Sequence, residues 1–238
     1  MALPLIGITT HAPGAQHRAA LDGLLALIVG AVERAGGLPL LIPPWLAAPA
    51  LAAMLGRIDG LLLAGGGDLD PALLYGAAHT AAIGGIEPER DQAELTLLRV
   101  ALAAPKPVFG ICRGAQISGM WRLAAHYTPI PAESTGALRH TYFPDHPLDL
   151  RPHLVQVAEG SRLAAIIGRP ELPVNSLHHQ ACRSVAGALR VAATAPGLVE
   201  AVELADHPFA LAVQWHPEAL PGVAEQRALF EAFVAACK

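Results

Sequence analysis

Short apolar runs alternate with longer amphipathic stretches through the first half of the chain. The runs predict buried strands, because each is brief and ends in glycine, proline or polar residues: 5–9, 38–42, 58–64 and 108–111. Between them, apolar residues at helical spacing predict helices near 19–35, 49–55 and 88–103. Strands that alternate with helices build a parallel sheet covered on both faces, so we predict a doubly wound α/β fold.

The second half of the chain has a different pattern, with strands predicted close together and little helix between them. These strands are expected at 154–157, 174–176, 189–193, 199–204 and 209–215, and a final helix at about 219–236. Such an order predicts a mixed or antiparallel extension of the mostly parallel sheet. No internal repeat or long linker interrupts the chain, so residues 1–238 are expected to form one domain.

Composition and charge narrow the class of protein. The formal net charge of −4 argues against nucleic-acid binding, and no apolar run is long enough to span a bilayer. Cys112, Cys182 and Cys237 lack metal-ligand spacing and cannot all pair with one another, which favours a reducing compartment. The first residues read as a strand and not as a signal peptide. We therefore expect a cytoplasmic protein that binds neither nucleic acid nor membrane.

The strand predicted at 108–111 runs into Cys112, which Gly110 and Gly114 flank. Gly-x-Cys-x-Gly is the thiol counterpart of the nucleophile elbow, a sharp turn from strand to helix with the reactive group at its apex. The start of the following helix would favour the thiolate form of this cysteine. Cys112 alone equally fits a buried apolar residue at the end of a core strand, so a partner base is needed to decide.

The last predicted strand delivers such a base. His216-Pro217-Glu218 follows it directly, at the carboxyl edge where open α/β sheets gather their chemistry. Glu218 is close enough in sequence to accept from the far ring nitrogen and fix the tautomer. Cys112, His216 and Glu218 thus fit a catalytic triad, although an isolated His-Pro-Glu often only begins a surface helix.

A glycine run at 65–67 ends the third predicted strand and has two interpretations. It fits a flexible turn that reverses the chain, or an oxyanion hole whose exposed backbone N–H groups meet a substrate carbonyl. The backbone N–H of Arg113, directly after the nucleophile, would be the second donor. A phosphate loop is disfavoured, because the lysine and hydroxyl of a P-loop are absent here.

Together these motifs resemble class I glutamine amidotransferases, and most closely their gamma-glutamyl-gamma-aminobutyrate hydrolase branch. The likeness covers almost the whole chain and rests on Gly110-Ile-Cys-Arg-Gly-Ala-Gln116, Gln214-Trp-His-Pro-Glu218, Gly65-Gly-Gly-Asp-Leu-Asp-Pro71 and Asn175-Ser-Leu-His-His-Gln180. It implies a flavodoxin-like sheet and attack of the thiol on a γ-glutamyl amide, in polyamine catabolism. It also implies the Cys112–His216–Glu218 triad and an oxyanion hole from the backbone of Gly66, Gly67 and Arg113.

The resemblance further implies a small γ-glutamyl molecule as the partner of the site. Gln116, Ser176 and His179 are the expected substrate-binding residues, because the Ser-Leu-His-His segment lies beside the glutamyl end in relatives. No cofactor is expected, and a homodimer is left open. One departure concerns the pocket wall: Leu123 and Ala124 replace two glycines of the usual pattern, and Thr128-Pro129 replaces a Gln-Asp pair. We expect larger side chains there to alter the preference for the leaving amine.

The histidines offer an alternative in the form of a metal site. His178 and His179 are adjacent, and His140, His146 and His153 lie upstream. Neighbours on an extended chain point to opposite faces and would not chelate one ion, so no metal is expected.

Three functions remain open: a free-standing γ-glutamyl hydrolase, a glutaminase subunit that supplies ammonia to a synthase, and a non-catalytic binding module. The intact triad disfavours the binding module, and Gly-Gly-Gly-Asp-Leu-Asp-Pro favours the hydrolase over the glutaminase subunit.

Overall fold

The N-terminal half folds into the parallel part of the sheet. The computed structural model describes residues 2–76, 78–81, 83–120, 127–129, 146–182, 185 and 188–238. Its first strands are β1 (Leu5–Thr9), β2 (Leu38–Ile42), β3 (Gly60–Leu63) and β4 (Val108–Ile111). They alternate with α1 (Arg18–Arg34), α2 (Ala48–Leu55) and α4 (Pro88–Ala103). β11 (Ala210–Val213) returns from far along the chain and pairs in parallel with β4, which gives the parallel order β2-β1-β3-β4-β11.

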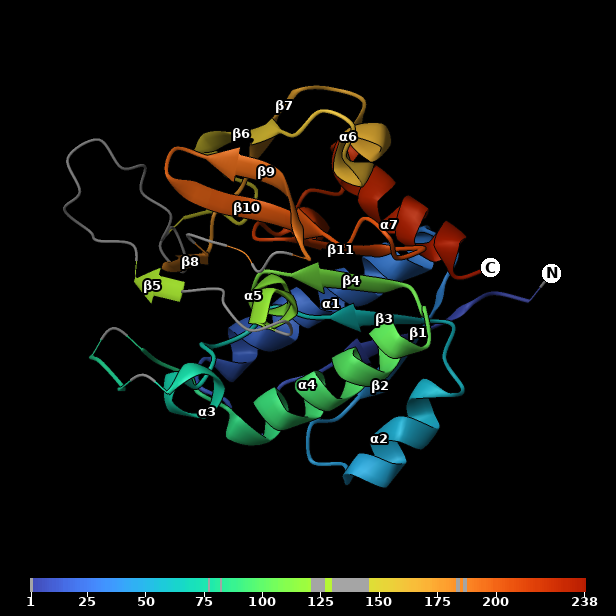
Figure 1. Cartoon of the computed structure of the whole chain (residues 1–238), viewed down its shortest axis with the longest axis vertical. Coiled ribbons are helices and arrows are strands. Elements are labelled where there is room, and N and C mark those ends of the chain that lie inside the picture. Colours follow the sequence, from blue (N-terminus) through green and yellow to red (C-terminus); the bar gives the residue numbers. More distant parts are fainter. Residues whose placement is uncertain are drawn as a thin grey trace.

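The C-terminal half extends this sheet with antiparallel strands, as the sequence predicts. Beyond β11 come β10 (Leu198–Glu203), β9 (Arg190–Ala195), β6 (His153–Val157) and β7 (Glu171–Val174). A side branch of β8 (Gln180–Cys182) and β5 (Tyr127–Pro129) pairs with β10. Figure 1 shows β10, β9, β6 and β7 above the parallel strands, and the two halves meet where β10 pairs with β11.

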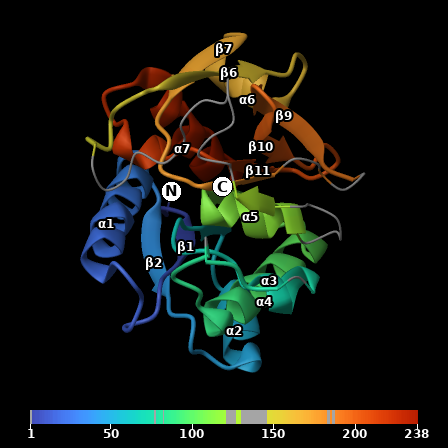
Figure 2. The ribbon, with the colours of Figure 1, turned by 90° about the vertical axis from the view of Figure 1, so that its left-hand side faces the viewer.

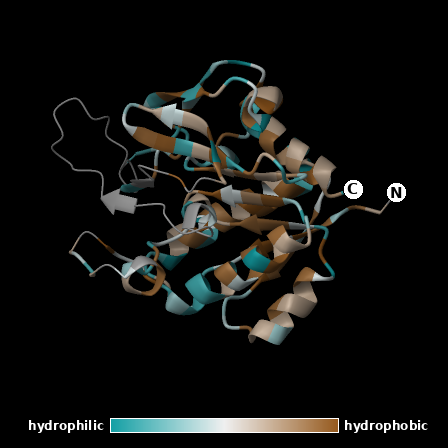
Figure 3. Ribbon diagram, viewed as in Figure 1, coloured by the Kyte–Doolittle hydropathy of each residue, from teal (hydrophilic) through white to brown (hydrophobic). Residues whose placement is uncertain are grey.

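Helices cover both faces of the parallel strands and bury two apolar cores. α1 and α7 (Ala224–Ala236) pack on one face, and α2 and α4 on the other (Figure 1 and Figure 2). Successive side chains of β3 point to opposite faces of the sheet and so enter different cores. Leu62 joins the core beneath α1 and α7, while Leu61 and Leu63 join the core beneath α2 and α4. Figure 3 shows the hydrophobic strands between the helix layers. This arrangement is the predicted doubly wound fold.

Several predicted boundaries in the second half are wrong. The strand expected at 174–176 ends at Val174, because its pairing with β6 stops at His153 and the residue before it, Pro152, has no N–H to continue the ladder. The helix expected from residue 219 begins at Ala224, after a 3₁₀ turn (Pro217–Ala219) and the breakers Pro221 and Gly222. The short helices α3 (Pro71–Tyr75) and α6 (Arg162–Ile167) were not predicted. Asp70 and Ser161 cap them.

The altered pocket wall falls largely outside the described residues. Leu123 and Ala124 are not described, and Thr128 and Pro129 lie in β5. Among the helices the structure describes, none is both long and apolar enough to cross a membrane.

Candidate active site

The groups singled out in the sequence gather where three neighbouring parallel strands end. β3, β4 and β11 lie side by side in the sheet. The glycine run at 65–67 follows β3, Cys112 follows β4, and His216 comes shortly after β11. Because the carboxyl ends of parallel strands share one edge, residues far apart in sequence meet here.

Cys112 occupies a sharp turn between β4 and α5 (Arg113–Met120). Its φ is +52°, a left-handed conformation that costs a non-glycine residue about 1–3 kcal/mol. The flanking glycines are required by close packing: a Cβ at Gly110 would stand 2.6 Å from the Gly114 carbonyl oxygen, and a Cβ at Gly114 would collide with the Leu63 carbonyl. The Cys112 amide donates to the Val213 carbonyl at 2.8 Å, so the turn is tied to β11.

His216 connects the cysteine to a carboxylate. Its Nδ1 lies 2.6 Å from Glu218 Oε1, and its ring also hydrogen-bonds the Cys112 side chain. Burial alone would lower the pKa of His216, but the Glu218 carboxylate and the Cys112 sulfur raise it to about 10. Gln214 Nε2 donates to Cys112 Sγ at 3.6 Å. The arrangement can therefore hold an imidazolium beside a thiolate.

Asn175 holds the backbone of His216 and was not predicted from the sequence. Its Oδ1 accepts from the His216 N–H at 2.9 Å, and its Nδ2 donates to the His216 carbonyl at 2.9 Å. A third bond reaches the Leu148 carbonyl at 2.8 Å. The side chain is fully buried directly after β7. Asn175 stands inside the strand expected at 174–176 and begins the Asn175-Ser-Leu-His-His-Gln180 motif, but neither pattern indicates this contact.

A cavity of about 280 Å³ opens over these groups. Its lining includes Cys112, His216, Gly66, Gly67, and the α1 residue Leu21, whose apolar side chain forms one wall. In the described part of the chain, no backbone acceptor takes the N–H of Gly66 or Gly67. These amides can therefore meet a ligand oxygen beside the sulfur.

Asp68 and His179 form an ion pair in the same cavity. His179 Nε2 lies 2.7 Å from Asp68 Oδ1, and that hydrogen bond raises the pKa of His179. Asp68 is in turn held by the segment between α3 and α4, because its Oδ2 accepts from the Gly84 N–H at 2.8 Å. The pair places a carboxyl group and an imidazole beside the reactive groups.

The other residues predicted to bind substrate lie deeper. Gln116 on α5 and Ser176 after β7 are buried, and the described lining of the cavity includes neither of them. Leu177 and His179, from the same segment as Ser176, do line it. His178 faces the Gln180 carbonyl at 3.0 Å while His179 faces Asp68, so the adjacent rings have different partners.

Comparisons with known proteins agree with this geometry. The Peptidase C26 family model matches residues 4–218. Gamma-glutamyl-gamma-aminobutyrate hydrolase PuuD of Escherichia coli (strain K12) is 38% identical over 219 residues, which cover 88% of this chain and 84% of that protein. Protein NtpR of Enterococcus hirae is 35% identical over 193 residues, or 80% of this chain and 79% of that protein.

A solved structure shows the same fold at low identity. The glutaminase domain of Trypanosoma brucei CTPS with bound acivicin aligns with a TM-score of 0.62 and 16% identity, over 98% of this chain and 94% of that one. The fold agrees with the family match and with the identity to a named hydrolase. The chain belongs to the Peptidase C26 family, within the class I glutamine amidotransferase-like proteins, and is a hydrolase of amide bonds.

Proposed function

We propose that the chain is a cysteine hydrolase that cleaves the γ-glutamyl amide bond of small γ-glutamyl amines through a thioester on Cys112. The observation that carries the proposal is the linked set Cys112, His216 and Glu218, which lies under a cavity with the glycine amides beside it. The identity to gamma-glutamyl-gamma-aminobutyrate hydrolase supports the choice of acyl group.

In the acylation step, the Cys112 thiolate attacks the γ-carbonyl carbon and a C–S bond forms. The carbonyl oxygen becomes an oxyanion, which the N–H groups of Gly66 or Gly67 and of Arg113 stabilise. As the C–N bond breaks, His216 donates its proton to the leaving amine. Glu218 keeps the ring oriented and stabilises its positive charge.

Deacylation repeats this geometry with water as the nucleophile. Neutral His216, formed in the first step, accepts a proton from water while the oxygen attacks the thioester carbon. Collapse of the second oxyanion breaks the C–S bond and releases glutamate and the Cys112 thiolate. The imidazolium is then restored beside the sulfur, in agreement with the pKa of about 10.

Asp68 and His179 are suited to the free end of a γ-glutamyl group. That end carries an α-ammonium and an α-carboxylate, and the cavity offers a carboxylate and an imidazole of raised pKa that already pair with each other. We infer that Asp68 binds the ammonium and His179 the carboxylate. Both bonds would be charge-assisted and are the stronger class of hydrogen bond.

The test is glutamate release by the purified chain from a panel of γ-glutamyl amines, with glutamine included and Cys112→Ala as the control. We expect several γ-glutamyl amines to be cleaved faster than glutamine. A clear preference for glutamine would favour a glutaminase that supplies ammonia to a synthase, and no release from any member would refute the proposal.

The acyl-end assignment has its own test, which compares γ-glutamyl with glutaryl amides of the same amine. The glutaryl amide lacks only the α-ammonium. Asp68→Asn should reduce the preference for the γ-glutamyl amide by about 10- to 100-fold, since a charged hydrogen bond contributes roughly 1.5–3 kcal/mol. Asp22→Asn, an exposed position on α1, is the matched control. An unchanged preference in Asp68→Asn would contradict the assignment.

A further inference from the structure

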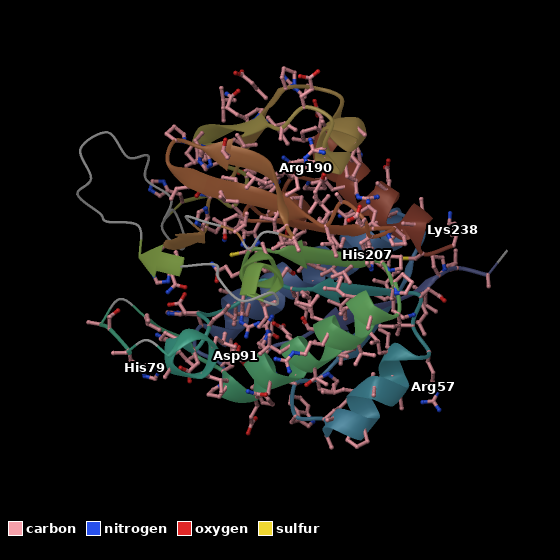
Figure 4. All side chains as sticks on the ribbon, in the orientation of Figure 1. Arg57, His79, Asp91, Arg190, His207 and Lys238 are labelled. Atoms are coloured by element: carbon pink, nitrogen blue, oxygen red, sulfur yellow. The ribbon has the colours of Figure 1, made fainter. Side chains whose placement is uncertain are left out.

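A cluster of buried charged residues lies beneath the glycine loop, and their side chains take no part in the reaction steps above. Its members are Arg90, Asp91 and Glu94 of α4 and Arg113 of α5, each at most 1% exposed; we call them the buried charge cluster. Asp91, labelled in Figure 4, marks it near the start of α4. Burying ion pairs is a weak source of stability, so such a cluster calls for another explanation.

Arg90 holds the loop by two carbonyl oxygens. Its Nη2 donates to Ala64 O at 3.0 Å and to Gly65 O at 2.9 Å. A Cβ at Gly66 would collide with Arg90 Nη1, so the guanidinium lies directly against the loop. In a planar trans peptide, the C=O and the N–H that follows it point in opposite directions. Because Gly65 O points to Arg90, the Gly66 N–H must point away from Arg90, and Gly66 lines the cavity beside Cys112.

Glu94 connects Arg90 to Arg113, the residue that carries the second oxyanion donor. Its Oε1 accepts from Arg90 Nε at 2.9 Å, and its Oε2 accepts from Arg113 Nη1. Arg113 is the residue whose backbone N–H is the other proposed donor. One carboxylate therefore spans the side chain that orients the Gly66 amide and the side chain of the residue that carries the Arg113 amide.

Two further side chains, those of Asp91 and Thr9, fix the ends of the loop. Asp91 pairs with Arg113 through Oδ1 and accepts from the Asp70 N–H at 2.9 Å through Oδ2. Thr9 Oγ1 donates to Glu94 at 2.7 Å and accepts from the Ala64 N–H at 3.1 Å. Burial opposes ionisation of Glu94, but Arg113 and Arg90 outweigh it and lower its pKa, so the bridge stays charged.

We propose that Arg90 is a positioning residue that sets the peptide orientation of the oxyanion hole, and that Glu94 holds the two oxyanion donors in register with each other. The inference rests on the proposed thioester mechanism. It assigns no contact with substrate to either residue.

The test separates an oxyanion effect from a general loss of structure. Arg90→Lys keeps the charge, but a single ammonium cannot reproduce the planar fork that reaches Glu94 and two carbonyls at once. We expect kcat for amide hydrolysis to fall by about 10²-fold, the size of a lost oxyanion donor, with KM little changed. Alkylation of Cys112 by iodoacetamide should proceed at the parent rate, because that displacement develops no oxyanion.

Arg99→Lys, an exposed position on the same helix, is the matched control and should change neither rate. Glu94→Gln is the second variant, with the same expected pattern, since its amide cannot accept from both arginines. Equal losses of hydrolysis and alkylation, an unchanged kcat, or failure of both variants to fold would show a merely structural role and overturn the proposal. The assay uses whichever amide the parent cleaves fastest, so the test stands even if that amide is not γ-glutamyl.

Discussion

The parallel and antiparallel halves of the sheet contribute different things to the site. The parallel half ends in the reactive groups themselves: the glycine loop after β3, Cys112 after β4 and His216 after β11. The antiparallel half ends in supporting side chains, with Asn175 after β7 and His179 before β8. The parallel half therefore supplies the groups proposed to react. The antiparallel half supplies a side chain that fixes the His216 backbone and one that lines the cavity.

This division follows from how each half is built. Parallel strands release their chains at a common edge, so backbone amides and short side chains converge without long reach. The antiparallel half reaches these groups through side chains, as Asn175 does with its bonds to the backbone of His216 and Leu148. Changes to the parallel half should therefore abolish chemistry, and changes to the antiparallel half should weaken it.

The largest effect is expected at the strand end of β4. Cys112→Ala should lower kcat by about 10⁴-fold or more, because it removes the nucleophile, while the melting temperature stays near that of the parent. Iodoacetamide at neutral pH should label Cys112 before Cys237, whose pKa burial raises to about 12. Peptide mapping measures the order of labelling, and faster labelling of Cys237 would contradict the assignment of Cys112 as the nucleophile.

Next come the groups after β11. His216→Asn should cost about 10²–10⁴-fold in kcat/KM, the contribution of a general acid–base group. Glu218→Gln should cost less, because the amide can still orient the ring but cannot stabilise the imidazolium. Steady-state kinetics on one amide compares the two variants, and equal losses would mean that Glu218 has another role.

The pH dependence of stability and of kcat/KM tests the pairing of His216 with Glu218. The folded-state pKa of His216 is about 10, above its ordinary 6.5, so the imidazolium stabilises the fold fully below about pH 6.5. That contribution is lost as the pH rises through about 10. We expect an alkaline limb of kcat/KM near the same pH, moved to lower pH in Glu218→Gln. An alkaline limb that Glu218→Gln leaves in place would contradict the pairing.

The smallest effect is expected in the antiparallel half. Asn175→Ala leaves the buried N–H of His216 unpaired and leaves its C=O with only the bond from the Ala219 N–H, which should cost about 1–3 kcal/mol of stability and several degrees in Tm. Its kcat should fall less than that of Glu218→Gln, since Glu218 still orients the ring. Asn175→Asp retains the acceptor but sets a buried carboxylate oxygen against the His216 and Leu148 carbonyls, so it should lower Tm at least as much as Asn175→Ala. A loss of kcat as large as that of Cys112→Ala would erase the distinction between the halves.

Local patterns predicted the parallel half well. β2, β4 and α4 have the predicted boundaries, because a short apolar run ended by glycine or proline, and a helix begun by Pro88, are visible without tertiary context. The turn at Cys112 was equally predictable from the Gly-x-Cys-x-Gly pattern, since Gly110 is required by its contact with Gly114 only four residues on, although the contact of Gly114 with Leu63 of β3 is a tertiary one. The half-buried strands of the second half have weaker hydrophobic patterns, and several of their observed ends differ from the predicted ones.

The sequence by itself determined the class of fold, the nucleophile and base that we propose, and the glycine loop, because each depends on residues that are neighbours along the chain. The tertiary structure alone decided which polar side chains support them. Asp68 and His179 are 111 residues apart, Asn175 and His216 are 41 apart, and Arg90 meets the glycine loop across 25. In sequence, each of these polar residues fits a solvated loop or helix face equally well. Only the packing of β3, β4, β7 and α4 buries Asp68, Arg90 and Asn175 and partly covers His179, and a hydrogen bond that is shielded from water is stronger than an exposed one.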